Sequence, residues 1–170
     1  MKLVSLVTWV STPVEVARLM FHIANIGPED VVCDLGAGDG LLLIMSVKDF
    51  GAKKAIGYEI RPDLCREVRL KARLLHMQHR IRIIQKPAQE ADFSQVSVIT
   101  IYLTTEANEI LRPHLETKVK PGTRIVSYLF PIGRWQSIKE IDLAELTFRE
   151  AHFVGKLYLY EAPQSFLKGR

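Results

Sequence analysis

The feature that most constrains the fold is a glycine-rich loop between two apolar segments. Val31, Val32 and Cys33 are typical of a short buried strand, and the loop Asp34-Leu35-Gly36-Ala37-Gly38-Asp39-Gly40 follows directly. Residues 39–50 are apolar on nearly every side, which is typical of a helix packed on a sheet. This order of strand, glycine loop and helix predicts a ligand-binding loop at the carboxyl end of a strand in an α/β sheet.

The rest of the chain alternates helix-like and strand-like segments. Helical patterns cover residues 12–26, 62–77 and 104–119, and strand patterns cover 55–60, 81–85, 96–103 and 123–130, with a closing hairpin at 138–146 and 152–160. Thr12, Pro13 and Glu15 predict a capped helix start, and Pro113 is expected to break or kink the helix at 104–119. The alternation predicts a Rossmann-like, doubly wound α/β fold, with a mostly parallel seven-stranded sheet, helices on both faces and a C-terminal β-hairpin.

Composition is consistent with one such domain. At about 150 residues per domain, 170 residues make roughly one, and 48% hydrophobic with 25% charged residues is ordinary for a globular protein. We expect a domain at residues 12–170 preceded by an arm at 1–11. Only Cys33 and Cys65 are present, which favours a reduced, cytoplasmic protein over a secreted one. No apolar run approaches the ~18 residues of a membrane span, so no membrane partner is expected.

The glycine loop also predicts the class of cofactor. A dinucleotide fingerprint would need glycine at position 41, which is Leu41. Asp34 and Asp39 flank the turn where a pyrophosphate would lie, and two like charges ~4 Å apart cost about 4 kcal/mol at an effective dielectric near 20. S-adenosylmethionine carries an ammonium, a sulfonium and no phosphate. Glu59 ends the next strand, where a carboxylate can accept hydrogen bonds from both ribose hydroxyls. We therefore predict S-adenosylmethionine as the cofactor.

Longer motifs resemble a known family. The runs VVCDLGAGDG and AIGYEI are similar to those of class I, seven-strand S-adenosylmethionine-dependent methyltransferases. The runs WVSTP, ITIYLTTEANEILRPHLE and PGTRIVSYLFPIGRW narrow the resemblance to the small archaeal protein-lysine methyltransferases and their mitochondrial relatives. The resemblance implies transfer of a methyl group to exposed lysines of protein substrates.

The resemblance also implies roles for individual residues. Trp9 and Thr12 match an aromatic residue and a threonine that close over the methionine end of the cofactor, so residues 1–11 would form a lid. Asp34 would order the glycine loop and hold the cofactor amino group, and Glu59 would hold the ribose. The implied cofactor-binding residues are Trp9, Thr12, Asp34, Leu35, Gly36, Ala37, Gly38, Gly40, Glu59, Ile60, Ala88, Gln89 and Tyr102.

Two positions depart from the family pattern. Relatives usually place a glycine and an adenine-contacting acid after the third strand, where this chain has Lys86-Pro87-Ala88-Gln89. The side chain of Pro87 forms no hydrogen bond, so the contact is missing or moves to Gln89 or Glu90. Relatives often carry a histidine and an acid where this chain has Tyr128 and Leu129. These departures leave a non-catalytic cofactor-binding module as an alternative.

The end of the fourth strand predicts the methyl acceptor. Tyr102, Leu103 and Thr104 are expected to face the nucleophile, and they include none of the Asn or Asp side chains typical of enzymes that methylate planar nitrogens. A lysine amine is strongly nucleophilic once neutral, and desolvation in an apolar channel lowers its free pKa of about 10.4. We expect Tyr102 to position the amine, with no dedicated general base.

Other patterns leave alternatives open. Residues 61–86 hold eight basic residues against two acidic ones, which suits either the solvated face of a helix or a surface for acidic partners. Methylation of RNA, DNA or a small molecule on the same fold is therefore the second hypothesis, although no recognition domain is attached. His76 and His79 lack neighbouring cysteine or acid ligands, so we expect no metal site. Cys33, inside an apolar strand, is interpreted as core.

Overall fold

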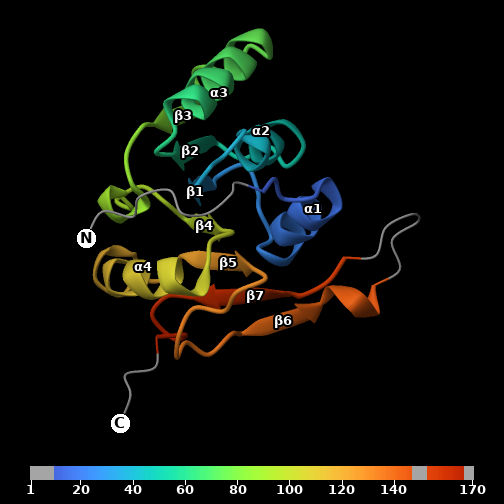
Figure 1. Cartoon of the computed structure of the whole chain (residues 1–170), viewed down its shortest axis with the longest axis vertical. Coiled ribbons are helices and arrows are strands. Elements are labelled where there is room, and N and C mark those ends of the chain that lie inside the picture. Colours follow the sequence, from blue (N-terminus) through green and yellow to red (C-terminus); the bar gives the residue numbers. More distant parts are fainter. Residues whose placement is uncertain (1–9, 147–152, 167–170) are drawn as a thin grey trace.

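The computed structural model describes residues 10–146 and 153–166, which form a sheet flanked by helices (Figure 1). The strands are β1 Val31–Leu35, β2 Lys54–Tyr58, β3 Ile81–Ile84, β4 Val98–Ile101, β5 Arg124–Tyr128, β6 Lys139–Asp142 and β7 Lys156–Glu161. Their order in the sheet is β3-β2-β1-β4-β5-β7-β6. Strands β1 to β5 run parallel, and β7 pairs antiparallel with both β5 and β6. The predicted seven-stranded sheet with a C-terminal hairpin is confirmed.

The direction of strand order reverses between β1 and β4. The chain moves outward from β1 through β2 to β3, and then returns to place β4 on the other side of β1. In an open α/β sheet, the loops at the carboxyl ends of the strands diverge at such a point and leave a crevice. The glycine loop after β1 and the segment after β4 therefore border the same crevice.

Helices cover both faces of the sheet. They are α1 Val14–Ile23, α2 Leu41–Lys48, α3 Pro62–Leu74 and α4 Thr105–Lys118, with 3₁₀ turns η1 Ala88–Glu90 and η2 Leu143–Glu145. Because side chains alternate along a strand, Val32 and Val98 pack on the face covered by α1 and α2, whereas Cys33 and Ile99 pack on the α4 face. Helix α3 packs beside α2 on the first face through a third apolar cluster.

Two details of the helices differ from the sequence-based expectations. Pro13 occupies the N-cap of α1, and no side chain caps this helix, so the predicted capping box is wrong. Thr12 is instead buried near the crevice. Helix α4 continues through Pro113, because buried Leu111 and Leu115 anchor it on either side of the proline. The predicted break in this helix is absent.

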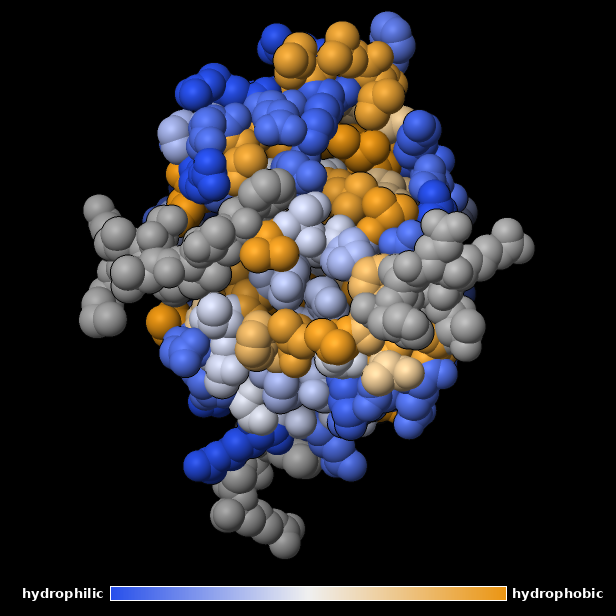
Figure 2. Space-filling model, turned by 45° about the vertical axis from the view of Figure 1, so that its right-hand side comes forward, coloured by the Kyte–Doolittle hydropathy of each residue, from blue (hydrophilic) through white to orange (hydrophobic). Residues whose placement is uncertain are grey.

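The apolar pattern of residues 62–77 predicts that Leu64, Val68, Ala72 and Leu75 form the buried face of helix α3, opposite its arginines. Leu64, Val68 and Ala72 are buried, but Leu75 is the C-cap of the helix and is 37% exposed. Three exposed arginines, Arg66, Arg69 and Arg73, form no ion pair with any residue that the structure describes. Leu70 and Leu74 are 57% and 71% exposed, and Figure 2 shows hydrophobic and hydrophilic side chains side by side at the end of the molecule where α3 lies.

Neither cysteine is a candidate nucleophile. Cys33 and Cys65 are free thiols, and both are buried. Burial raises the pKa of each thiol, most strongly that of Cys33, so the reactive thiolate is disfavoured. The interpretation of Cys33 as a core residue is confirmed. Within the described ranges, no helix is long and apolar enough to cross a membrane.

Candidate cofactor and acceptor site

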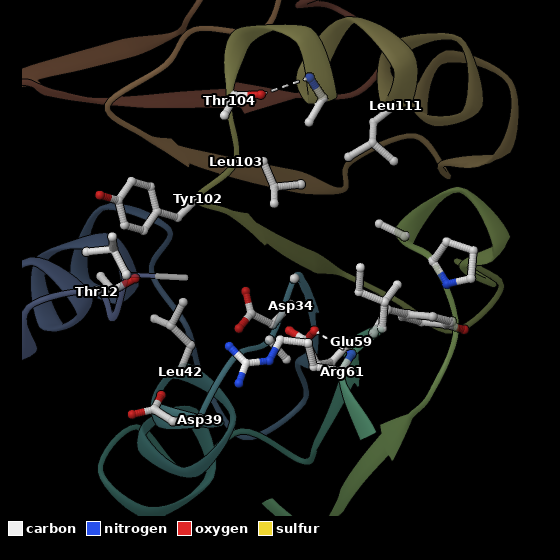
Figure 3. Close-up of a pocket in the computed structure, with 18 of the residues that line it drawn as sticks. Thr12, Asp34, Asp39, Leu42, Glu59, Arg61, Tyr102, Leu103, Thr104 and Leu111 are labelled. Carbon is white, nitrogen blue, oxygen red and sulfur yellow. Dashed lines mark hydrogen bonds between the residues drawn. The ribbon is translucent and has the colours of Figure 1, made fainter. Parts of the chain in front are cut away.

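A cavity of about 360 Å³ opens at the carboxyl ends of the parallel strands (Figure 3). It is bordered by the segment before α1, the glycine loop, the end of β2, the segment after β3, and the segments after β4 and β5. Its lining includes these residues predicted from the sequence: Thr12, Asp34, Gly36, Ala37, Glu59, Ile60, Ala88, Gln89, Tyr102, Leu103 and Thr104. The topology thus brings together residues from widely separated parts of the chain.

Three predicted glycine-loop residues shape the cavity without lining it. Leu35 is buried in the sheet, below the cavity. Gly40 is the N-cap of α2 with φ +78°, and a Cβ there would lie 2.8 Å from Val68 Cγ2. Gly38 has φ +52°, which favours glycine, and its N–H donates to Glu59. Gly38 and Gly40 therefore set the path of the loop. Trp9, the remaining predicted residue, lies outside the described residues.

Glu59 connects the glycine loop to the end of β2. Its carboxylate is 7% exposed, and Oε2 accepts a 2.9 Å hydrogen bond from the N–H of Gly38. Oε1 accepts one of 2.9 Å from the N–H of Arg61. Each carboxylate oxygen has two lone pairs, so one acceptor position on each remains for a ligand. This geometry fits recognition of two adjacent hydroxyl groups.

Asp34 provides a second buried carboxylate, at the end of β1. It is 3% exposed, and its Oδ1 accepts a 2.7 Å hydrogen bond from Thr100 Oγ1 on β4. The pKa of Asp34 is raised to about 7, mainly by burial and also by the nearby charges of Glu59 and Asp39, against the opposing effect of the Thr100 hydrogen bond. A cationic ligand would offset the free-energy cost of burying the ionised carboxylate.

The charges around the cavity favour a cation over a phosphate. No described residue forms an ion pair with Asp34 or Glu59, because the neighbouring Arg61 pairs with Asp63 instead. Buried carboxylates without a basic partner are costly, and a bound ammonium group would compensate them. The residues present therefore fit S-adenosylmethionine. In the described part of the chain, no cluster of three His, Cys, Asp or Glu could hold a metal.

Four residues of the segment after β3 line the cavity, and two of them, Lys86 and Gln89, are polar. Pro87, Ala88 and Gln89 all line it, and Lys86 pairs with Glu90 at 3.3 Å. Glu90 forms this ion pair and does not line the cavity. Of the two residues considered as replacements for the missing adenine-contacting acid, Gln89 is the one at the cavity.

The segment after β4 faces the carboxylates across the cavity (Figure 3). Tyr102 stacks obliquely on Tyr128, with ring centroids 4.6 Å apart and planes at 44°. Leu103 contacts the glycine loop, since a Cβ on Gly36 would lie 2.9 Å from its Cδ2. Thr104 is the N-cap of α4, and its side chain accepts a hydrogen bond from the N–H of Ala107. Thr104 thus fixes the start of α4.

Sequence reasoning missed part of the lining. Leu42, Leu111, Leu129 and Phe130 also border the cavity. Leu129 and Phe130 follow β5, so the rule that ligands bind beyond strand ends could have found them. Leu42 and Leu111 carry no such signal, because the hydrophobic pattern of a helix predicts that a residue is buried but not that it borders a cavity.

The strand order, the glycine loop and the two unpaired carboxylates define an S-adenosylmethionine-dependent methyltransferase of class I. Comparison with known proteins gives the family. The ANTKMT methyltransferase domain matches residues 34–139, well over half of the chain. The chain belongs to this family.

Individual relatives agree with the assignment. A protein-lysine N-methyltransferase of Saccharolobus islandicus (strain REY15A) is 39% identical over 91% of this chain and 92% of its own length. An adenine nucleotide translocase lysine N-methyltransferase of Mus musculus is 27% identical over 62% of this chain, which corresponds to 45% of that protein. A crystal structure from Salinibacter ruber, described as an RNA methyltransferase in complex with S-adenosyl-L-homocysteine, has a TM-score of 0.84 and 32% identity, with 94% of this chain and 98% of that one covered. The resemblance seen in the sequence is confirmed, as is the cofactor.

Proposed function

We propose that this methyltransferase transfers a methyl group from S-adenosylmethionine to the amine of lysine side chains in proteins. The match to a protein-lysine N-methyltransferase over nearly the full length of both chains carries the proposal. The cofactor supplies an activated methyl group on a sulfonium. The protein's task is to bind this group, align an amine with it and keep water away.

The lining after β4 supports an aliphatic amine as the acceptor. Tyr102, Leu103 and Thr104 include no carboxylate or amide that could draw electron density onto a planar nitrogen. An apolar channel disfavours the charged ammonium form of lysine, and a neighbouring positive sulfonium disfavours it further. Tyr102 would position the amine, Leu103 would close the apolar wall, and Thr104 would hold the segment through its cap on α4.

RNA methylation is the second candidate function, and a specific observation favours it. The Salinibacter ruber protein, 32% identical to this chain, is described as an RNA methyltransferase. The three unpaired arginines on α3 would suit phosphates as well as acidic protein segments. The exposed Leu70 and Leu74, which directly follow Arg69 and Arg73, suit a protein partner better than a phosphate backbone.

Further parts of the proposal concern the substrate and its location. The partners would be proteins with exposed lysines, and acidic segments of these proteins would meet the basic face of α3. We place the enzyme in the cytoplasm, where its two buried thiols would stay reduced. Residues 12–170 would form the catalytic domain, and residues 1–11 an arm that closes over the cofactor.

The experiment is methyl transfer from labelled cofactor to mixed proteins and to mixed RNA, followed by mass spectrometry. We expect increments of about 14 Da on lysine (one CH₃ replacing one H, a net gain of CH₂), strongly reduced in Tyr102→Ala. Tyr158→Ala on β7 is the matched control, because Tyr158 lies outside the cavity lining. Label on RNA alone, or on glutamine, would overturn the proposal. Tight cofactor binding with no transfer to either acceptor pool would point to a binding module.

A further inference from the structure

The chain makes a strained three-residue turn directly after β5. Leu129 has φ +70°, and the N–H of Phe130 donates a 2.9 Å hydrogen bond to the carbonyl of Tyr128 across it. This is a γ-turn with its central residue in the left-handed region, a strained form that bulky residues rarely adopt. Such strain persists only where the surrounding structure imposes it, and it concentrates at functional sites.

Asn108 of α4 holds this turn from outside the cavity. Its side chain is 1% exposed, and Nδ2 donates hydrogen bonds to the carbonyls of Phe130 at 3.2 Å and Pro131 at 3.3 Å. The Ser127 hydroxyl donates to the same Phe130 carbonyl. Among buried side-chain polar atoms of the described residues, only Asn108 Oδ1 lacks a partner. The two hydrogen bonds to the turn therefore fix the orientation of the Asn108 amide, although its Oδ1 is left without a hydrogen-bond partner.

Gly155 leaves the space that the Leu129 side chain occupies. A Cβ on Gly155 would lie 2.2 Å from Leu129 Cδ1, a distance at which the leucine has to move. The N–H of Leu129 also donates a 2.9 Å hydrogen bond to the carbonyl of Lys156, in the strand that Gly155 precedes. Residues from α4, β5 and the start of β7 thus fix one conformation of Leu129.

The turn lies beside the residue expected to position the acceptor. Leu129 and Phe130 both line the cavity. Parallel pairing of Ile101 with Ser127 places the ends of β4 and β5 side by side, and it brings Tyr102 against Tyr128. The strained residue therefore forms the wall of the cavity next to Tyr102.

We propose that the turn at Leu129 is the acceptor-selecting wall of the active site. This inference deepens the proposed lysine methylation and rests on it. The branched, apolar side chain of Leu129 borders the cavity, and in this proposal it admits the unbranched methylene stem of lysine and excludes planar, ring-bearing acceptors. Asn108 and Gly155 are positioning residues that act through Leu129.

The first test is a pair of glycine-to-alanine variants. Gly155→Ala and Gly51→Ala both place alanine at a left-handed φ, +95° and +73°, but a Cβ on Gly51 has nothing within 4 Å. Both variants should lose thermal stability through the strained φ, Gly155→Ala more than Gly51→Ala because of its clash with Leu129, and both should bind S-adenosylhomocysteine within about twofold of wild type in calorimetry. Only Gly155→Ala should lower kcat/KM for a lysine peptide, by about tenfold, mainly through KM. Equal kcat/KM in the two variants would overturn the inference.

The second test distinguishes a role of Leu129 in selecting the acceptor from a role in packing alone. Leu129→Gly relieves the strained φ at position 129, and in the Gly155→Ala background it also removes the clash, so the double variant should regain the part of the thermal stability that the clash costs. Its acceptor selectivity should remain lost. We expect the ratio of kcat/KM for a lysine peptide to that for a 4-aminomethylphenylalanine peptide to fall at least tenfold in both Leu129→Gly proteins. An unchanged ratio would overturn the inference.

The two proposals fail in different ways. If the wild-type protein leaves the lysine peptide unmethylated, the proposed function is wrong, and the inference fails with it. If the wild-type protein methylates the peptide but Leu129→Gly keeps its selectivity, the lysine activity stands and only the acceptor-selecting wall is refuted.

Discussion

The N–H of Gly38 donates a 2.9 Å hydrogen bond to Oε2 of Glu59, 21 residues further along the chain. The bond ties the glycine loop after β1 to the end of β2. Because the other carboxylate oxygen of Glu59 accepts from the N–H of Arg61, one side chain fixes two of the segments that border the cofactor cavity. Glu59 thus shapes the site as well as offering its remaining lone pairs to a ligand.

Glu59→Gln should weaken cofactor binding more than the loss of one ligand contact would suggest. The amide has one acceptor oxygen, so it cannot accept from both backbone N–H groups, and its NH₂ would face one of these donors. We expect at least tenfold weaker binding of S-adenosylhomocysteine in calorimetric titration. Glu90→Gln, an exposed residue paired with Lys86, is the matched control and should bind normally. Equal affinity in both variants would contradict the role of Glu59.

Cofactor affinity should depend on pH through Asp34. The pKa of this buried carboxyl is raised to about 7, and its ionised form is the one that attracts an ammonium group. Affinity should therefore rise as pH increases from 6 to 8, and Asp34→Asn should bind weakly at every pH. Calorimetric titrations across this range provide the measurement. A pH-independent affinity in the wild-type protein would contradict the prediction.

The same carboxyl should make the cofactor-free protein less stable as pH rises. Because the folded-state pKa of about 7 lies above the ordinary value of 3.8, the folded protein binds more protons than the unfolded chain between these two pH values. The contribution of Asp34 to stability is full below about pH 3.8 and is lost as pH rises through about 7, by up to about 4 kcal/mol. At pH 8, Asp34→Asn should unfold at a higher temperature than wild type, whereas the exposed Asp63→Asn should not.

Removing residues 1–11 should lower cofactor affinity. Val10 and Ser11 line the cavity, and the hydroxyl of Ser11 lies 3.5 Å from Oδ2 of Asp39. The truncated chain keeps every described helix and strand, so its circular dichroism and unfolding temperature without cofactor should match those of the full chain. We expect at least tenfold weaker S-adenosylhomocysteine binding, and a similar loss in Trp9→Ala. Normal binding by the truncated protein would remove the role predicted for Trp9.

The methylation rate at saturating cofactor should rise between about pH 7 and 9. Without a general base, the neutral fraction of the lysine amine limits the reaction, and this fraction grows with pH. At saturating cofactor, the effect of Asp34 on cofactor affinity no longer changes the rate, so the pH dependence reports the lysine amine. A rate that is flat over this range would indicate that a group on the enzyme removes the proton.

Arg124 should stabilise the sheet without affecting cofactor binding. It pairs with Asp30, which is 9% exposed, and donates to the carbonyls of Ala24 and Asn25 at the amino ends of the strands, opposite the cavity. Arg124→Ala leaves a buried carboxylate unpaired and should cost about 3 kcal/mol in urea unfolding. Arg18→Ala breaks an exposed pair with Asp49 and should cost less than about 1 kcal/mol. Both should bind cofactor normally.

The sequence by itself determined the fold, the cofactor and much of the site. Alternating apolar segments specify strands and helices locally, and the short loops of a parallel sheet leave few topologies. Asp34 and Glu59 were identifiable because each lies at the carboxyl end of a strand, and parallel strands place such ends at one edge. The motifs after β1 and β4 were sufficient to indicate the family.

Tertiary structure alone decided the rest. Thr12 was predicted both to cap α1 and to bind the cofactor, and packing places it at the cavity without a capping role. Helix α4 continues through Pro113 because its packing contacts outweigh one lost hydrogen bond. The strained turn at Leu129 depends on Asn108, 21 residues earlier, and on Gly155, 26 residues later. Such a conformation is unfavourable in the isolated segment. It exists only where distant parts of the chain meet, and no local pattern in the sequence encodes that meeting.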